Sequence, residues 1–78
     1  MRAKKPTLII TFHTTTQAMA VERFCMEKQL PGRIIPVPRE ITSGCGLCWK
    51  AAPADREPLL SALQAGKLDW EAVYELEF

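Results

Sequence analysis

The sequence predicts a small α+β domain whose elements follow the order βαββαβ. The chain has 78 residues, enough for one domain with a two-layer core. Apolar residues make up 47% of it and charged residues 24%, as is typical of a folded globular protein. Strand-like and helix-like hydrophobic patterns alternate along the chain, with proline or glycine between them. We therefore expect a single domain over residues 1–78, with a basic N-terminal tail at residues 1–6.

The first half of the chain predicts a central strand, a helix and an edge strand. Residues 7–12 are apolar or β-branched throughout, which indicates a strand buried on both faces. Threonines then offer hydroxyl caps to a helix over residues 17–29, and a Pro-Gly pair ends it. Residues 33–37 form the second predicted strand, and Pro36 and Pro38, which lack backbone donors, favour an edge position for it.

The second half predicts two more strands around a second helix. Residues 47–52 can form a strand, and the helix over residues 53–65 opens at a proline and stops before a glycine. Over residues 72–78 apolar and acidic positions alternate, as in a strand that packs on one face. This order is the split-βαβ, ferredoxin-like pattern, a two-layer sandwich with an antiparallel-type sheet and both helices on one face.

A glycine-rich turn with two cysteines carries the strongest chemical signal. It reads Ser43-Gly44-Cys45-Gly46-Leu47-Cys48. The flanking glycines leave little cover over the Cys45 sulfur, so we expect that sulfur to be accessible. The chain has three cysteines, and this odd number argues against a disulfide framework.

The predicted topology places this turn near the start of the first helix. In the ferredoxin-like pattern the first two strands run in the same direction, so their ends lie at the same edge of the sheet. We therefore expect Cys45 near residues 13–16, where unpaired amide groups and the helix dipole would stabilise a thiolate. The same surroundings would hold a persulfide or selenide anion.

The segment before Cys45 resembles the selenium/sulfur carrier-like proteins. Their central motif is Ile-Pro-x-Pro-Arg-Glu-Ile-x-Ser-x-Cys-Gly, and residues 35–46 read Ile-Pro-Val-Pro-Arg-Glu-Ile-Thr-Ser-Gly-Cys-Gly. The likeness extends over roughly Leu8 to Tyr74. The resemblance implies a ferredoxin-like fold and a carrier role for sulfur or selenium, with Cys45 as the carrying thiol. The chain departs from the pattern at Cys48, where members commonly have an aliphatic or small residue.

Cys48 opens an alternative reaction. It could attack a Cys45 persulfide, releasing sulfide and leaving an intramolecular disulfide, so a thiol-disulfide redox module is the second hypothesis. Metal binding is less favoured, because Cys45, Cys48 and His13 make an incomplete zinc site and Cys25 is expected in the core. We predict no metal and no cofactor.

The other candidate site residues are expected at the same end of the fold and would bind an anion. His13 could supply charge or move a proton, although a strand-end histidine is more often only polar surface. Arg39 could pair with an anionic sulfur species or a partner carboxylate. The predicted anion-binding residues are His13, Thr14, Thr15, Thr16, Arg39, Gly44 and Gly46. The threonines have helix capping as their alternative role.

The sequence favours a carrier over an independent enzyme. It contains no Ser-His-acid set, phosphate-binding loop or convincing carboxylate pair. A non-catalytic interaction domain is the third hypothesis, because fold alone does not settle function. We expect donor and acceptor proteins for sulfur or selenium as partners, and the sequence does not choose between the two elements.

Charge and hydropathy narrow the partners further. Residues 1–54 carry a net charge of +5 and residues 55–78 a net charge of −4, weak support for an anionic partner near the first half. The basic residues form no dense cluster, so we do not expect nucleic-acid binding. No apolar run reaches the roughly 18 residues of a membrane span, and no signal peptide is recognised, so we predict a cytoplasmic protein without membrane contact. A homodimer is plausible through the sheet edges.

Overall fold

The predicted element order is confirmed in the computed structural model, which describes residues 5–41 and 44–77. In chain order the elements are β1 (Pro6–Thr11), α1 (Thr15–Glu27), β2 (Arg33–Pro36), β3 (Leu47–Ala51), the short 3-10 helix η1 (Pro53–Asp55), α2 (Arg56–Ala65) and β4 (Ala72–Glu77). Three parts of the sequence predictions fall outside the described residues: most of the N-terminal tail, the Thr-Ser pair at 42–43, and the last residue of the final strand.

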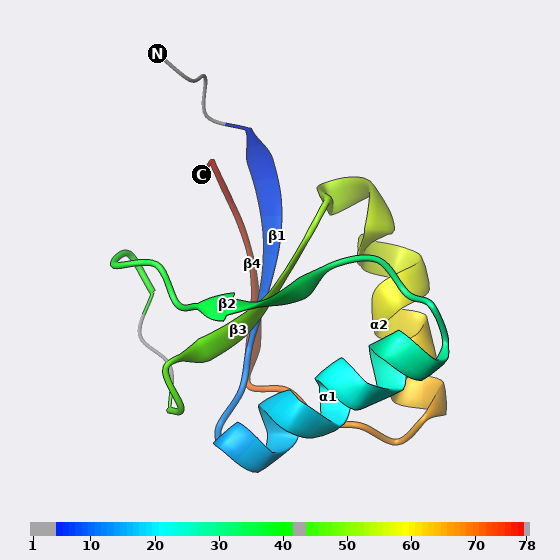
Figure 1. Cartoon of the computed structure of the whole chain (residues 1–78). Coiled ribbons are helices and arrows are strands. Elements are labelled where there is room, and N and C mark those ends of the chain that lie inside the picture. Colours follow the sequence, from blue (N-terminus) through cyan, green and yellow to red (C-terminus); the bar gives the residue numbers. More distant parts are fainter. Residues whose placement is uncertain (1–4, 42–43, 78) are drawn as a thin grey trace.

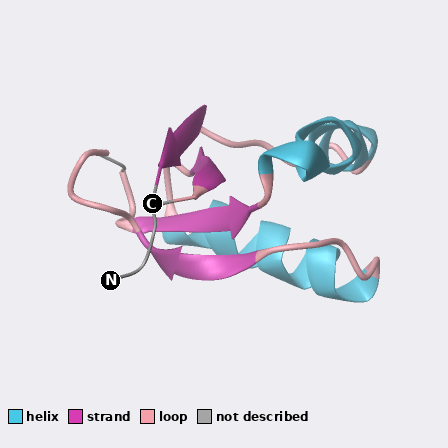
Figure 2. Ribbon diagram, turned by 90° about the horizontal axis from the view of Figure 1, so that it is seen from above, coloured by secondary structure: helices cyan, strands magenta, loops and turns pink. Residues whose placement is uncertain are grey.

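The four strands form one sheet in the order β2-β3-β1-β4. Every neighbouring pair is antiparallel, so β1 and β2 run in the same direction with β3 between them. Both helices lie on one side of this sheet (Figures 1 and 2). The predicted ferredoxin-like sandwich is therefore confirmed, and β2 is an edge strand as its prolines indicated.

The main core lies between the sheet and the helices, and we call it the helix-side core. Alternate residues of β1 and β3 meet apolar stripes of α1 and α2 there. Its buried members are Leu8, Ile10, Phe12, Ala18, Val21, Cys25, Trp49, Ala51, Leu59 and Leu63. Because Thr7, Ile9 and Thr11 of β1 are buried on the other face, β1 is central and covered on both sides, as predicted.

A second, smaller cluster covers the opposite face of the sheet, and we call it the outer-face cluster. Its buried members are Ile9, Ile41 and Cys48, with Ile35 and Leu76 packed against them. Ile41 comes from the loop between β2 and β3, which projects from the sheet away from α2 (Figure 2). The loop that carries Cys45 is therefore anchored to the outer face of the sheet.

The prediction that the last strand packs on one face is wrong. Val73 lies opposite Ile10, so it shares the side of the helix-side core, which it contacts. Leu76 points the other way and packs on the outer-face cluster. Between them Tyr74 is 38% exposed. The second cluster explains the difference, because it gives the sheet an apolar contact on both faces.

Helix α1 begins earlier than the sequence predicted because Thr14 caps it. The Thr14 hydroxyl accepts a hydrogen bond from the Gln17 amide at 3.1 Å, and the Gln17 side chain accepts one from the His13 amide at 2.9 Å. These reciprocal bonds fix the chain between β1 and α1. Among the described residues, no helix has the length and apolar character needed to cross a membrane.

Candidate functional site

A hydrogen bond joins the two ends of the loop that carries Cys45, and a buried side chain of the loop packs on the sheet. The Val37 amide donates a hydrogen bond to the Gly46 carbonyl at 3.0 Å where β2 leaves the sheet and β3 enters it. A tight turn follows, in which the Ile41 amide donates to the Pro38 carbonyl at 3.1 Å. The Ile41 side chain is only 7% exposed and belongs to the outer-face cluster. The two ends of this loop are therefore fixed relative to the sheet.

The cysteine turn touches the chain just after β1. A Cβ atom added at Gly44 would lie 2.4 Å from the His13 carbonyl oxygen and 3.1 Å from its carbonyl carbon. Only glycine allows this close approach of two backbones. Figure 1 shows the start of β3 and the end of β1 at the same end of the sheet. Gly44 and His13 thus meet where the topology predicted the cysteine turn to lie.

The Cys45 sulfur is bound to the backbone of its own turn. It accepts a hydrogen bond from the Leu47 amide at 3.4 Å and lies 3.5 Å from the Leu47 carbonyl oxygen, to which the thiol can donate. The Cys45 side chain also contacts the helix-side core and is half-buried. The sulfur is therefore less exposed than the glycines suggested, because the turn curls the side chain back onto the start of β3.

Cys48 lies on the other face of the sheet. Its side chain is 0% exposed within the outer-face cluster, and its sulfur is 4.0 Å from the Pro36 carbonyl oxygen. Burial, with a smaller contribution from nearby Cys45, raises the pKa of Cys48 to about 11, so Cys48 is a neutral thiol at pH 7. The two side chains pack on opposite faces, and no disulfide joins them. A resolving role for Cys48 stays a prediction.

Cys25 is the third thiol and lies in the helix-side core. Its side chain is 0% exposed, and burial raises its pKa to about 11. It is held on α1, within the apolar stripe that the sequence predicted for it. Of the three cysteines in the chain, all of them described, Cys45 alone is not fully buried.

His13 lies beside an acidic residue that the sequence did not single out. The His13 Nδ1 is 3.7 Å from the Glu71 carboxylate, and their side chains are 60% and 29% exposed. Glu71 is placed there because its amide donates a hydrogen bond of 2.7 Å to the Thr11 carbonyl. The only sequence signal for it is an acidic residue directly before a strand that pairs with β1. A pair this exposed adds little stability, so its interest is its position next to the cysteine turn.

The remaining predicted anion-binding residues differ in whether their side chains are already engaged in the fold. Thr14 is engaged in capping α1, which was its alternative role. Thr15 and Thr16 are exposed in the first turn of α1, and Arg39 is exposed in the turn between β2 and β3. Their predicted contacts with an anion stay predictions.

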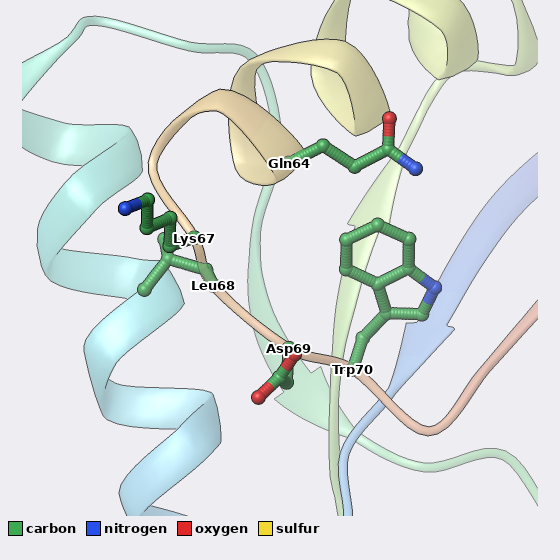
Figure 3. Close-up of a pocket in the computed structure, with 5 residues that line it drawn as sticks. All are labelled: Gln64, Lys67, Leu68, Asp69 and Trp70. Atoms are coloured by element: carbon green, nitrogen blue, oxygen red, sulfur yellow. The ribbon is translucent and has the colours of Figure 1, made fainter.

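A shallow pocket of about 450 Å³ lies near the end of α2. Figure 3 shows Gln64 and Trp70 on one side of the segment that leads into β4, with Lys67 and Leu68 pointing toward α1. The pocket includes no residue of the cysteine turn. Within residues 5–41 and 44–77, no three His, Cys, Asp or Glu side chains are grouped to hold a metal ion.

The chain matches a known protein-family model. No curated protein and no solved structure matches the chain significantly. The model of the family described as "Putative Se/S carrier protein-like" matches residues 7–75, which include both helices, all of β2 and β3, and most of β1 and β4. The chain therefore belongs to the Se/S carrier protein-like family.

Proposed function

We propose that this protein carries sulfur or selenium on Cys45, as a persulfide or selenosulfide, between a donor and an acceptor protein. The observation that carries the proposal is the accessibility of Cys45 in a chain that belongs to a family of carrier-like proteins. It is the one cysteine of the three whose side chain is not fully buried, and it lies in a turn pinned to the end of the sheet. A sulfur that is only half-buried, at the end of the sheet, suits a group that another protein must reach.

The transfer chemistry needs one reactive thiol and no net oxidant. In loading, the Cys45 thiolate attacks the outer sulfur of a donor persulfide, a new S–S bond forms at Cys45, and the donor cysteine leaves as a thiolate. In discharge, an acceptor thiolate attacks the outer sulfur on Cys45, and the electron pair of the broken bond returns to the Cys45 sulfur. Each step exchanges one S–S bond for another. A selenium atom in the outer position follows the same steps.

The buried cysteines support a carrier more than a redox pair. A redox cycle requires the two sulfurs of Cys45 and Cys48 to come within bonding distance. Their side chains pack on opposite faces of the sheet, and Cys48 is buried in the same outer-face cluster as Ile41. Closing a disulfide would therefore disturb the start of β3, whereas carrying a single outer atom on Cys45 would not.

Loading can be tested by intact mass measurement. The purified chain would be incubated with a cysteine desulfurase and either L-cysteine or L-selenocysteine, then desalted. We expect a mass increase of one sulfur or one selenium atom, located on Cys45 by peptide mapping. Treatment with cyanide should remove the outer sulfur as thiocyanate, which confirms a persulfide.

Three variants sharpen the test. Cys45→Ser should abolish loading, while Cys25→Ala should load like the unmodified protein. Cys48→Ala should also load normally if Cys45 acts alone, whereas a redox module would lose its two-hydrogen mass change in this variant. An unloaded wild-type chain, or loading that persists in Cys45→Ser, would reject the carrier proposal.

The partners follow from this chemistry. The donor and the acceptor each need a cysteine or selenium-bearing group that can reach the Cys45 sulfur at the end of the sheet. The homodimer considered from the sequence stays a prediction, and light scattering of the purified chain would check it. Comparing loading rates with the two amino-acid substrates would decide between sulfur and selenium.

A further inference from the structure

The Leu47 amide occupies a special position in the sheet. The register between β1 and β3 ends at the Thr11 and Cys48 pair, one residue after Leu47. On the other side of β3, Pro36 is the residue opposite Leu47, and the neighbouring cross-strand bond runs from Val37 to Gly46. The Leu47 amide therefore lies just beyond the ladder with β1, and the Cys45 sulfur accepts its hydrogen bond at 3.4 Å.

Gly46 directs this amide. Its φ is +75°, a left-handed conformation that residues with a Cβ adopt at a cost. A Cβ at this position would have no atom within 4 Å, so space alone does not require glycine. What glycine provides is the backbone conformation that turns the chain between Cys45 and Leu47 and aims the amide back at the sulfur.

We propose that the Leu47 amide, aimed by Gly46, is the hydrogen-bond donor that holds negative charge on the Cys45 sulfur during transfer. The inference rests on the proposed carrier function and adds a positioning residue, Gly46, to it. Negative charge develops on this sulfur in discharge, when the bond to the outer atom breaks and the electron pair returns. A donor already in place stabilises that charge without rearrangement.

The neighbouring carbonyl does not cancel this effect. The Cys45 thiol can also donate to the Leu47 carbonyl oxygen at 3.5 Å, which favours the protonated form. A thiol is a weak donor, however, whereas a hydrogen bond that an amide donates to a charged acceptor is roughly twice as strong as a neutral one. When the thiol proton leaves, the hydrogen bond that the Leu47 amide donates is kept and strengthened, and only the weak bond to the carbonyl is lost. The two groups together therefore favour the thiolate.

The test is the rate at which iodoacetamide alkylates Cys45 in the folded full chain, followed by peptide mass mapping from pH 6 to pH 10. Gly46→Ala disfavours the left-handed turn, while Gly46→Asn tolerates it and serves as the matched control. We expect Gly46→Ala to raise the pH midpoint of alkylation by about one unit, a tenfold change in thiolate fraction. A thiolate becomes about threefold more nucleophilic for each unit by which the pKa of its thiol rises. The rate at pH 7 should therefore fall only about threefold, and the plateau at high pH should rise.

The pH profiles of Gly46→Ala and the unmodified protein should therefore cross, which distinguishes the proposal from a purely structural role of Gly46. A turn that merely loosens would expose Cys45 more and raise its rate at every pH without moving the midpoint. The neighbouring titratable groups, which include Cys48, His13, Glu71 and the loop residues Arg39 and Glu40, are unchanged in both variants. A second variant replaces the peptide bond between residues 46 and 47 by an ester, which removes the Leu47 N–H donor and keeps every side chain; it should lower the rate at pH 7 like Gly46→Ala.

The proposal is overturned if Gly46→Ala and the ester both keep the midpoint of the unmodified protein, or if Gly46→Ala raises the rate at all pH values. Alkylation needs no donor protein, so this result is independent of loading. Failure to load with an intact midpoint shift would reject the carrier proposal and leave the amide assignment standing. Normal loading without a shift would do the reverse.

Discussion

Replacing Gly44 by alanine should push the cysteine turn away from the end of β1. The new Cβ would lie 2.4, 3.1 and 3.2 Å from the carbonyl oxygen, carbonyl carbon and Cα of His13. These are backbone atoms, and the reciprocal hydrogen bonds with Gln17 hold His13 in place, so no flexible side chain can give way. Such overpacking typically costs about 1–3 kcal/mol, and we expect about 2 kcal/mol here.

Urea unfolding followed by tryptophan fluorescence would measure this loss. Trp49 is 2% exposed on β3 and should report the opening of the core. A loss of about 2 kcal/mol corresponds to a fall of roughly 8–16 °C in the melting temperature of a domain of this size. The displaced turn should also change the alkylation rate of Cys45 in the folded protein.

Gly66→Ala is the matched control. Its Cβ would lie 2.7 Å from the Cε1 atom of the Phe24 ring, so the clash is with a side chain rather than backbone. The ring can shift by a few tenths of an ångström, and Gly66 has an ordinary φ of −82°. We expect a smaller loss of stability and no change at Cys45. If Gly44→Ala unfolds like the wild type and alkylates at the same rate, the contact with His13 does not hold the cysteine turn in place.

Three further predictions concern the buried thiols and the surface. Because the pKa values of Cys25 and Cys48 are each raised to about 11, both thiols stabilise the fold below their ordinary pKa near 9, and this stability is lost as pH rises toward 11. The unfolding free energy should fall over this range, by on the order of 2–3 kcal/mol for each thiol, and the fall should be smaller in Cys25→Ala. Cys48→Ala should cost about 1 kcal/mol in urea unfolding because it leaves a small cavity in the outer-face cluster, and a larger loss would mean that this cluster carries more of the fold than its size suggests. Arg56→Ala removes a 2.7 Å ion pair with Glu75 whose side chains are 48% and 44% exposed, so it should cost less than about 1 kcal/mol, and thermal melts in high salt should show no difference from wild type.

The element order could be predicted because each element has a clear local cause. The change from apolar runs to helical spacing, with proline or glycine between them, is visible in the sequence alone. The start of α1 was less determined, since three consecutive threonines offer equivalent hydroxyls. The choice of Thr14 depends on Gln17, whose amide and side chain complete the cap on both sides.

The strand topology predicted where the cysteine turn lies, but not the other details of the candidate site. Parallel β1 and β2 bring the cysteine turn to the end of β1, and the contact between Gly44 and His13 agrees with that. The position of Glu71 depends on how β4 pairs with β1, and the exact register cannot be read from alternation alone. The separation of Cys45 from Cys48 depends on where β3 begins, which a Cys-x-x-C spacing does not specify.

The way the cysteine turn is held matters for the proposed transfer between two partner proteins. A sulfur on a free loop would be ordered again at each encounter, at a cost in entropy that weakens binding. Here the loop is fixed at three points: the bond between Val37 and Gly46, the Ile41 side chain on the outer-face cluster, and the contact of Gly44 with His13. Folding has then already ordered the turn, so the proposed donor and the proposed acceptor would each meet the sulfur in the same position. The exposed side chains of Arg39 and Glu40 on the same loop would then be available to distinguish one proposed partner from the other.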